Sequence, residues 1–263
     1  MLANLLLAIQ QSTKNYAPQV VTGVVGTTRN LAMNVTAASA TATITADEVV
    51  VETALGGSQY RIGSFSKTIN LATTGAGGMD TGTVPANGFV GIYAIYNPTT
   101  GASALLAVNA AAVIGEVYGG NNMPNGYTAS ALLTVVPTGS SQFKVVSVSG
   151  RKISIQAALL YSGSSALTNA QISIASVIPL NSKSVTGFNY LSNTASGTMS
   201  IGVAGSLQSV AQQQTGAYLI GGVVVSIPYV FIPIYTPGSI FLSSSNATSG
   251  TPTYSVYGSG YEI

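Results

Sequence analysis

The sequence predicts an all-β protein made of two antiparallel β-sandwich domains of jelly-roll-like type, preceded by a short N-terminal α-helix. Apolar segments of strand length recur at a spacing of roughly 8–12 residues with turn residues between them, as in sandwiches and jelly rolls. The chain has 30 glycines and is rich in Ser, Thr and β-branched residues, a composition that favours short strands and turns. Apolar and polar residues alternate in many segments, which is typical of strands with one buried face.

The strongest single signal is residues 88–108, GFVGIYAIYNPTTGASALLAV, in which two apolar runs flank a turn. Neither face of a strand in the first run would be polar, so we expect a strand that is covered on both sides. Residues 97–101 supply the reversal, because Pro98 presets one turn dihedral and Gly101 tolerates a positive φ. The segment therefore predicts a central β-hairpin.

Further strands surround this hairpin in a first domain predicted over residues 19–149. A glycine-rich loop at 74–82 leads into the hairpin, and a long polar loop at 118–126 follows it. The remaining strands predicted for this domain are residues 20–25, 31–35, 41–45, 48–53, 60–65, 67–71, 129–136 and 143–148.

A second domain is predicted over residues 150–263, with its boundary at Ser149 and Gly150. Apolar and polar residues alternate more cleanly here, which indicates half-buried antiparallel strands. The segments that show this most clearly are residues 152–159, 171–174 and 198–203, and residues 239–242 and 253–263 complete the domain.

Residues 217–235 differ from the rest of the second domain because they are apolar almost throughout. Pro228 and Pro233 interrupt the segment, and proline cannot donate a hydrogen bond to a β-ladder. We therefore expect this segment at the edge of a sheet or at a bulge. An exposed apolar edge promotes aggregation, so the segment also predicts burial against another subunit.

Residues 1–18 are predicted to form an N-terminal helix that serves in anchoring or oligomerisation. Leu2, Leu5, Leu6 and Ile9 fall on one stripe of a helix that Pro18 would end. One alternative is a terminal helix packed on its own domain, and another is a secretion signal, which the missing basic start and Asn4 disfavour. No apolar run reaches the ~18 residues of a spanning helix, so no membrane insertion is expected.

The charged fraction of 5% is far below the roughly 25% of ordinary globular proteins. A lone soluble subunit normally covers itself with ionic groups, so this composition predicts a chain that is packed with copies of itself. The net charge is +2 and the basic residues are scattered, which excludes an electrostatic footprint for nucleic acid. The chain has no cysteine or histidine, so Ser-His-Asp and Cys-His catalysis are excluded.

Only six carboxylates are available for acid–base chemistry. A glycosidase needs two of them on either side of one bond. Asp47, Glu48 and Glu52 are expected on a solvated strand surface. Asp80 and Glu116 would form a pair if the loops at 74–82 and 118–126 converged, which the sequence does not show. We therefore predict no catalytic residues and a protein that is not an enzyme.

The glycine-rich loop at 74–82 predicts a structural turn and no cofactor. It has neither the Gly-Lys-Ser/Thr of a P-loop nor the glycine spacing of a dinucleotide fingerprint. Asp80 alone is a poor calcium ligand, because hard cations require six or more oxygens. The prediction is therefore no cofactor and no metal.

Two groups of residues are candidates for binding. Tyr118 and Tyr127 flank the polar loop that contains Asn121 and Asn122, and aromatic faces beside amides suit contact with a glycan or another receptor. Aromatic residues also crowd the C-terminal half, where core and interface packing is the more ordinary explanation. The residues predicted there for an oligomer or anchoring interface are Tyr229, Phe231 and Ile232, together with Leu2, Leu5, Leu6 and Ile9 of the N-terminal helix.

Three stretches of the chain resemble tail-fibre and tail-appendage proteins of tailed bacteriophages. They are TGAGGMDTG at 74–82 with GFVGIYAIYNPTTG at 88–101, MPNGYTASAL at 123–132, and SVYGSGY at 255–261. The likeness is best over residues 40–150 and looser beyond. These motifs recur in fibre sequences and carry no catalytic signature.

The resemblance implies a virion structural protein, assembled in the bacterial cytoplasm and exposed on the extracellular particle. It implies a homotrimer attached through its N-terminal part to other tail or capsid proteins, with distal β-domains available to a host surface glycan or protein. The alternative is an adaptor, collar or head-decoration subunit without receptor binding. A third hypothesis is a polysaccharide depolymerase.

Overall fold

The computed structural model describes residues 23–247 and 249–263. The described chain is all-β, with 17 strands in antiparallel sheets of 13 and four strands. It contains no helix, and therefore none that is long and apolar enough to cross a membrane. The predicted helix at residues 1–18, with Leu2, Leu5, Leu6 and Ile9, lies outside the described residues.

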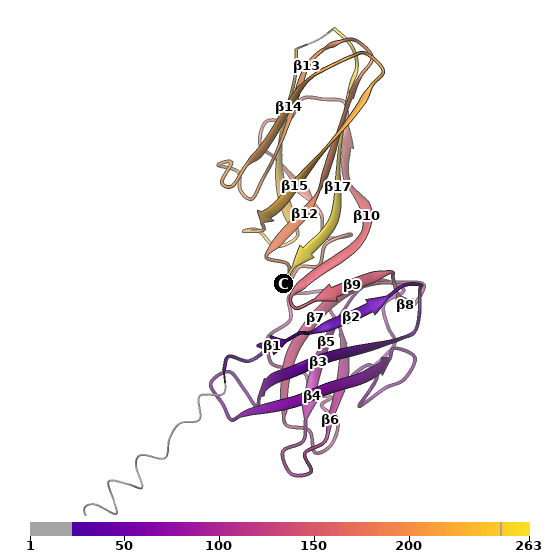
Figure 1. The fold of residues 1–263 in the computed structure, drawn as a ribbon, viewed down its shortest axis with the longest axis vertical. Coiled ribbons are helices and arrows are strands. Elements are labelled where there is room, and N and C mark those ends of the chain that lie inside the picture. Colours follow the sequence, from indigo (N-terminus) through magenta and orange to yellow (C-terminus); the bar gives the residue numbers. More distant parts are fainter. Residues whose placement is uncertain (1–22, 248) are drawn as a thin grey trace, which may run out of the picture.

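The strands form two lobes that lie end to end (Figure 1). We call residues 23–150 lobe 1 and residues 151–263 lobe 2. The strands of lobe 1 are β1 (Thr28–Arg29), β2 (Ala32–Val35), β3 (Thr41–Glu52), β4 (Gln59–Asn70), β5 (Asn87–Tyr96), β6 (Ser103–Asn109), β7 (Ala129–Gly139), β8 (Gln142–Phe143) and β9 (Val146–Ser149).

The predicted central hairpin is confirmed, since β5 pairs with β6 from Val90↔Asn109 to Tyr96↔Ser103. The opposite edge of β5 pairs with β7, and side chains on both faces of β5 are buried. A Cβ at Gly91 would overlap the end of the Ile114 side chain. The missing side chain thus lets the loop before β7 pack directly on the hairpin.

A second layer of lobe 1 follows the order β4-β3-β2-β9. It joins the β7-β5-β6 layer through the pairing of Glu52 with Ser130. The glycine-rich loop closes the other side, because Asn70 N donates to Gly77 O at 2.7 Å and Gly77 N donates to Leu105 O at 2.7 Å. The loop is therefore structural, as predicted. Fully buried side chains of lobe 1 include Ile44, Ile69, Ile92, Leu105, Leu106 and Phe143.

Lobe 2 contains eight strands in two layers. They are β10 (Lys152–Gly163), β11 (Ala170–Ser173), β12 (Ser184–Asn193), β13 (Gly197–Ala204), β14 (Gln213–Leu219), β15 (Val224–Pro233), β16 (Ser239–Asn246) and β17 (Pro252–Glu262). One layer has the order β15-β12-β17-β10 and the other β11-β16-β13-β14. Buried side chains between them include Ile174, Val185, Met199, Ile201, Ile240, Tyr254 and Val256.

The apolar segment 217–235 ends β14 and forms β15. Both strands lie at the end of their sheet order, so the edge position predicted from Pro228 and Pro233 is confirmed. An edge strand has one unpaired side, and a proline whose nitrogen faces that side removes no hydrogen bond from the ladder.

The two lobes share one hydrogen-bonded sheet because β10 pairs with β9 on one side and with β17 on the other. Side chains strengthen the junction. The buried hydroxyl of Tyr261 donates to Val135 O at 2.7 Å. Arg151 donates from Nη2 to Glu116 Oε1 at 2.6 Å and from Nε to Ile263 O at 2.9 Å. The lobes are therefore joined by backbone pairing, by the buried hydrogen bond of Tyr261 and by the partly exposed ion pair of Arg151 with Glu116.

Candidate functional site

Tyr118 anchors the polar loop that was predicted to contact a receptor. Its hydroxyl donates to Asp80 Oδ2 at 2.9 Å and accepts from Asn122 N at 3.2 Å. Its ring meets Tyr93 edge to face, with centroids 5.7 Å apart. Burial, followed by the hydrogen bond to Asp80, raises the pKa of Tyr118. With 9% exposure, this ring serves the internal structure of the loop and presents no free face.

The other predicted members of this site differ in exposure. Asn121 and Asn122 are exposed, and Tyr127 is half-buried against the core. Tyr118 and Asn122 are brought together by the hydrogen bond above. The loop therefore offers amide groups to a ligand, and its aromatic rings are largely used within the chain.

Asp80 and Glu116 each have a separate partner. Asp80 accepts from Tyr118 and, at 2.7 Å, from the backbone N–H of Thr81. Glu116 forms an ion pair with Arg151 at 2.6 Å. Both carboxylates lie near Tyr93, whose pKa is raised first by burial and then by Glu116, Tyr118 and Asp80. Their hydrogen bonds give each carboxylate a structural role.

The three carboxylates of β3 do not share one environment. Asp47 is exposed and accepts from Asn30 Nδ2 at 2.6 Å, and Glu48 pairs with Arg61 at 3.4 Å. Glu52 is 4% exposed and accepts from Gln59 Nε2 at 2.5 Å. The expected solvated surface is therefore wrong for Glu52, because the turn after β3 folds over it. In the part of the chain that is described, no group of three His, Cys, Asp or Glu residues could hold a metal ion.

Tyr229 and Ile232 lie inside lobe 2. They are 1% and 0% exposed, and Tyr229 donates its hydroxyl to Tyr257 O at 2.7 Å. Phe231 is 55% exposed and has a φ of 52°. The register of β12 and β15 shifts between Val185 and Gly187, so residues on either side of the shift do not keep simple alternation. The predicted interface is thus corrected: Phe231 is available to a partner, and Tyr229 and Ile232 are not.

A cluster of aromatic rings covers the outer face of the β15-β12-β17-β10 layer. Phe188 pairs with Tyr257 across the strands, and their rings stack with centroids 5.1 Å apart. Tyr190 lies 5.1 Å from Phe188 and 5.2 Å from Tyr257. Tyr257 pairs in turn with Leu159, which is 49% exposed. We call Leu159, Phe188, Tyr190 and Tyr257 the aromatic face.

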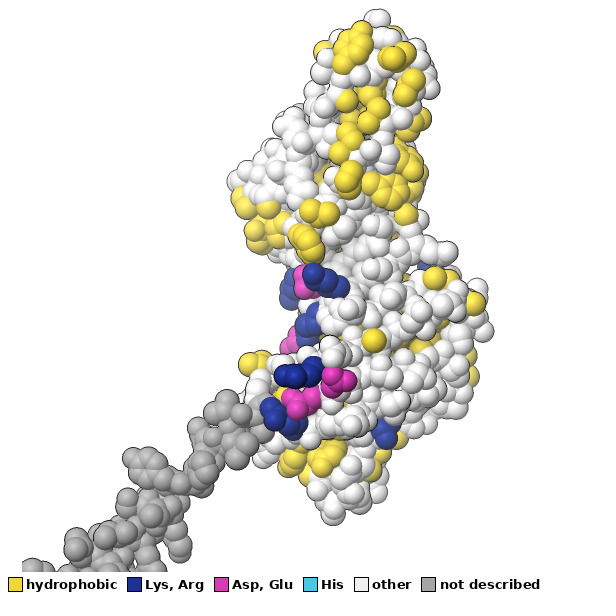
Figure 2. All heavy atoms as spheres, in the orientation of Figure 1, with side chains coloured by type: hydrophobic (Ala, Val, Ile, Leu, Met, Phe, Trp, Pro, Cys, Tyr) yellow, Lys and Arg dark blue, Asp and Glu magenta, His cyan; other side chains and the backbone are white. Residues whose placement is uncertain are grey.

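Lobe 2 carries most of the large apolar side chains that are exposed. Figure 2 shows these side chains spread over lobe 2, whereas charged side chains gather in a strip along lobe 1 and the junction. The large apolar residues of lobe 2 that are exposed are Leu159, Tyr190, Leu207, Val210, Tyr218, Ile220, Val223, Val224, Val230, Phe231 and Tyr235.

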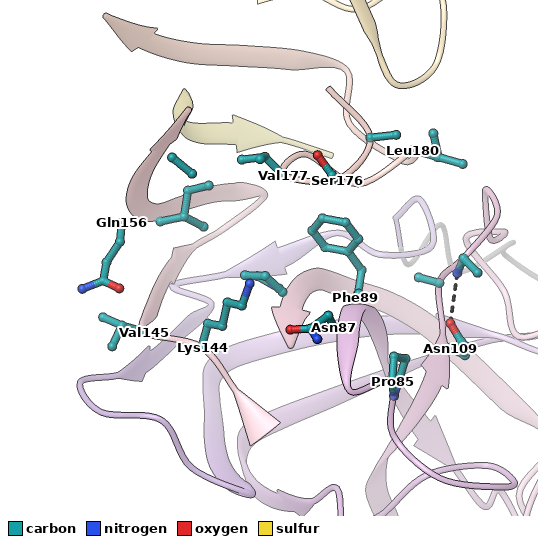
Figure 3. A pocket seen from close by; sticks show the side chains of 17 residues that line it. Pro85, Asn87, Phe89, Asn109, Lys144, Val145, Gln156, Ser176, Val177 and Leu180 are labelled. Carbon is teal, nitrogen blue, oxygen red and sulfur yellow. Dashed lines mark hydrogen bonds between the residues drawn. The ribbon is translucent and has the colours of Figure 1, made fainter. Parts of the chain in front are cut away.

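A cleft of about 510 Å³ lies between the lobes. Figure 3 shows Phe89 and Lys144 of lobe 1 facing Val177 and Leu180 of lobe 2 across it. Its full lining is Pro85, Asn87, Gly88, Phe89, Asn109, Ala110, Ala111, Pro137, Lys144, Val145, Ile155, Gln156, Ala158, Ala175, Ser176, Val177 and Leu180.

Neither the aromatic face nor the cleft was predicted from the sequence. The sequence contained a signal for the aromatic face, since Phe188 and Tyr190 fall on one face of a strand and Val185 and Leu191 fall on the other. Large apolar side chains on both faces of a strand favour a cover on each face. The cleft had no comparable signal, because its lining comes from segments far apart in the chain.

A comparison with protein-family models finds no match, and a search of curated proteins finds no relative. Fold and surface thus define the class: an all-β protein with two antiparallel sheets, a surface poor in charge and an apolar outer face on lobe 2.

Proposed function

We propose that this chain is a structural protein of a bacteriophage virion, which assembles as a homotrimer and takes part in attachment to the host surface. The observation that carries the proposal is the exposed apolar surface of lobe 2 in a chain with 5% charged residues. Large apolar patches on soluble proteins mark interaction sites. Copies of the same chain are the cover that is available at the highest local concentration during assembly.

The aromatic face has the character of the centre of an interface. Aromatic residues are enriched where protein interfaces bind most strongly. Its rings already contact one another, so docking would order few additional side chains. Phe231 extends the apolar surface, with Lys152 Nζ 5.1 Å from the centre of its ring.

The strand order of lobe 2 supports the same proposal. Eight antiparallel strands in layers β15-β12-β17-β10 and β11-β16-β13-β14 fit a jelly roll, an architecture used by viral capsid and lectin domains. We therefore interpret lobe 2 as a jelly-roll domain. Fold alone does not define function, so this support is secondary to the surface.

Attachment is assigned to lobe 2 because the described chain begins in lobe 1, away from the far end of lobe 2 (Figure 1). A protein anchored through its N-terminal part would present lobe 2 outward. Three copies on one particle would raise apparent affinity for a repeated surface molecule without any new contact. Other tail or capsid proteins would contact the N-terminal part.

The mass of the purified full chain in solution, measured by light scattering over a range of concentrations, tests the assembly. We expect a trimer, three times the subunit mass of 26.5 kDa. Leu159→Glu places a charge on the aromatic face and should dissociate the trimer. Thr198→Asp, at an exposed position on the opposite layer, is the matched control and should not. A wild-type monomer at high concentration with a normal unfolding transition would refute the assembly.

Binding of the labelled trimer to host cells separates attachment from the alternative of an adaptor, collar or head-decoration subunit. Saturable binding supports attachment, and a trimer that does not bind cells supports the alternative. Release of reducing ends from host polysaccharide, abolished in Asp80→Asn or Glu116→Gln, would instead establish a depolymerase.

A further inference from the structure

The cleft between the lobes has the size and rigidity of a ligand site. Its volume of about 510 Å³ lies within the roughly 300–1,000 Å³ of small-molecule pockets. Its walls are held in place by the shared sheet and by side-chain hydrogen bonds between the lobes. These hydrogen bonds join Tyr261 to the backbone of Val135 and Asn181 to the backbone of Ile114. The cleft is therefore formed before any ligand enters it.

The charge in the cleft has one sign. Lys144 is the single charged residue among the described residues that line it, and no carboxylate lines it. In Figure 3 the Lys144 side chain lies along the floor toward Phe89. Lys144 is exposed, and the apolar walls on one side of it still let it attract an anion more strongly than it would in open water. The ligand favoured here carries one negative group.

Two amide side chains also line the cleft: Asn87 and, on the other side of Phe89 from Lys144 in Figure 3, Asn109. Asn109 accepts from Ala111 N at 3.1 Å through Oδ1, which leaves its NH₂ group to donate. The exposed side chain of Asn87 lies between Lys144 and Phe89 in Figure 3. Amides at these positions suit the hydroxyl groups of a polar ring.

The remaining walls are apolar. Phe89 points from the floor toward Val177 and Leu180 on the opposite wall (Figure 3). An aromatic ring beside aliphatic groups suits the C–H face of a pyranose. Small residues, among them Ala110, Ala111 and Ala175, leave the space open.

We propose that this cleft binds a single sugar ring that carries one anionic group, with the anion at Lys144, hydroxyls at Asn87 and Asn109, and the C–H face against Phe89. The anionic group is a carboxylate, as in a uronic acid, or a phosphate. The proposal deepens the attachment function above and rests on it for the source of the sugar, a host surface glycan.

Calorimetric titration and saturation-transfer NMR of the full chain test the proposal with three probes: methyl glucuronide, glucose 6-phosphate and neutral methyl glucoside. We expect at least one anionic probe to bind. The neutral probe should bind more weakly by a factor of about ten or more, since a charge-assisted hydrogen bond contributes about 1.5–3 kcal/mol. Whichever anion binds better identifies the carboxylate or the phosphate as the preferred group.

Substitutions in the cleft locate the binding. Lys144→Gln should weaken binding of the anionic probe about tenfold and leave binding of the neutral probe unchanged. Lys183→Gln, at an exposed lysine outside the cleft lining, is the control and should change the binding of neither probe. Ala111→Trp, at an exposed position on the rim, should block all probes by filling the space.

Equal binding of neutral and anionic probes, unchanged binding in Lys144→Gln, or no binding of any probe at about 10 mM would overturn the proposed site. A monomeric protein that binds glucuronide would refute the trimer and retain the site, so the two failures are distinguishable.

Discussion

The side-chain amide of Asn181 in lobe 2 makes two hydrogen bonds to the backbone of Ile114 in lobe 1. Nδ2 donates to Ile114 O at 2.8 Å, and Oδ1 accepts from Ile114 N at 3.1 Å. Asn181 is 7% exposed, so little water can replace these bonds. One side chain thus pairs both polar groups of a loop residue across the junction of the lobes.

Asn181→Ala should destabilise the protein by about 2 kcal/mol, because buried polar groups that lose their partners cost about 1–3 kcal/mol. The free energy of unfolding from urea titration measures this. Asn125→Ala, at an exposed loop position, is the control and should change it by less than about 0.5 kcal/mol. Equal losses in the two variants would show that the contact with Ile114 adds nothing.

Gly187→Ala should be among the most damaging single changes in lobe 2. A Cβ there would overlap the backbone oxygen of Tyr257 and approach Tyr229 Oη to 2.5 Å, forcing β12 and β17 apart. We expect a loss of more than about 2 kcal/mol, since overpacking against backbone cannot relax by a rotamer change.

Gly216→Ala is the matched control for Gly187→Ala, because the nearest atom to its Cβ is Met199 O at 3.6 Å. Its free energy of unfolding should stay within about 1 kcal/mol of the wild type. Urea titration of both variants provides the comparison. If Gly187→Ala left stability unchanged, the register shift at Gly187 would not depend on the close contact of its backbone with Tyr257.

Stability should fall in alkali because of the buried tyrosines. Burial raises the pKa of Tyr229 and of Tyr261 above the usual value of 10.0. Above pH 10 the unfolded chain loses these protons while the folded chain keeps them, so the unfolded state is favoured as pH rises. Below pH 10 both states are protonated, and this contribution to stability is fully present.

Tyr229→Phe should reduce the alkaline slope of the free energy of unfolding by about 1.4 kcal/mol per pH unit. Urea titrations between pH 8 and pH 11.5 measure that slope. Tyr218→Phe, at a side chain that is 71% exposed, is the control. An unchanged slope in Tyr229→Phe would exclude Tyr229 as a source of the alkaline loss.

Tyr118→Phe should loosen the polar loop without unfolding the protein. The change removes the acceptor for Asn122 N and the donor to Asp80. Since a hydrogen bond contributes about 1 kcal/mol, exchange of the Asn122 amide hydrogen should accelerate by roughly fivefold to tenfold. Hydrogen-exchange NMR measures it, with Tyr127→Phe as control. Identical exchange rates in both variants would contradict the anchoring role of Tyr118.

Local sequence patterns predicted the strands well where neighbouring residues decide the outcome. The hairpin at 88–108 is present, and the pairs of short strands predicted at 41–53 and 60–71 are β3 and β4, each continuous. The continuity was missed because Asp47 and Ser66 interrupt the apolar pattern in the sequence, whereas β3 and β4 keep one register on both sides of Asp47. Backbone pairing tolerates a polar residue on the exposed face.

The candidate site was predicted less well, because side-chain exposure depends on distant partners. Tyr118 is held by Asp80, 38 residues away in sequence, and no local pattern encodes that contact. In β15, a register shift against β12 and the positive φ of Phe231 turn Tyr229 and Ile232 inward. Strand periodicity assumes an unbroken ladder, so it fails where the register changes.

The sequence by itself determined that residues 23–247 and 249–263 are all-β and that residues 217–235 occupy a sheet edge, because alternation and proline act through the local backbone. Tertiary structure alone decided the aromatic face and the cleft. Phe188 and Tyr257 meet only when β12 and β17 pair, and Phe89 faces Val177 only when the lobes dock. Such sites arise from contacts between segments far apart in the chain, and no local sequence pattern specifies those contacts.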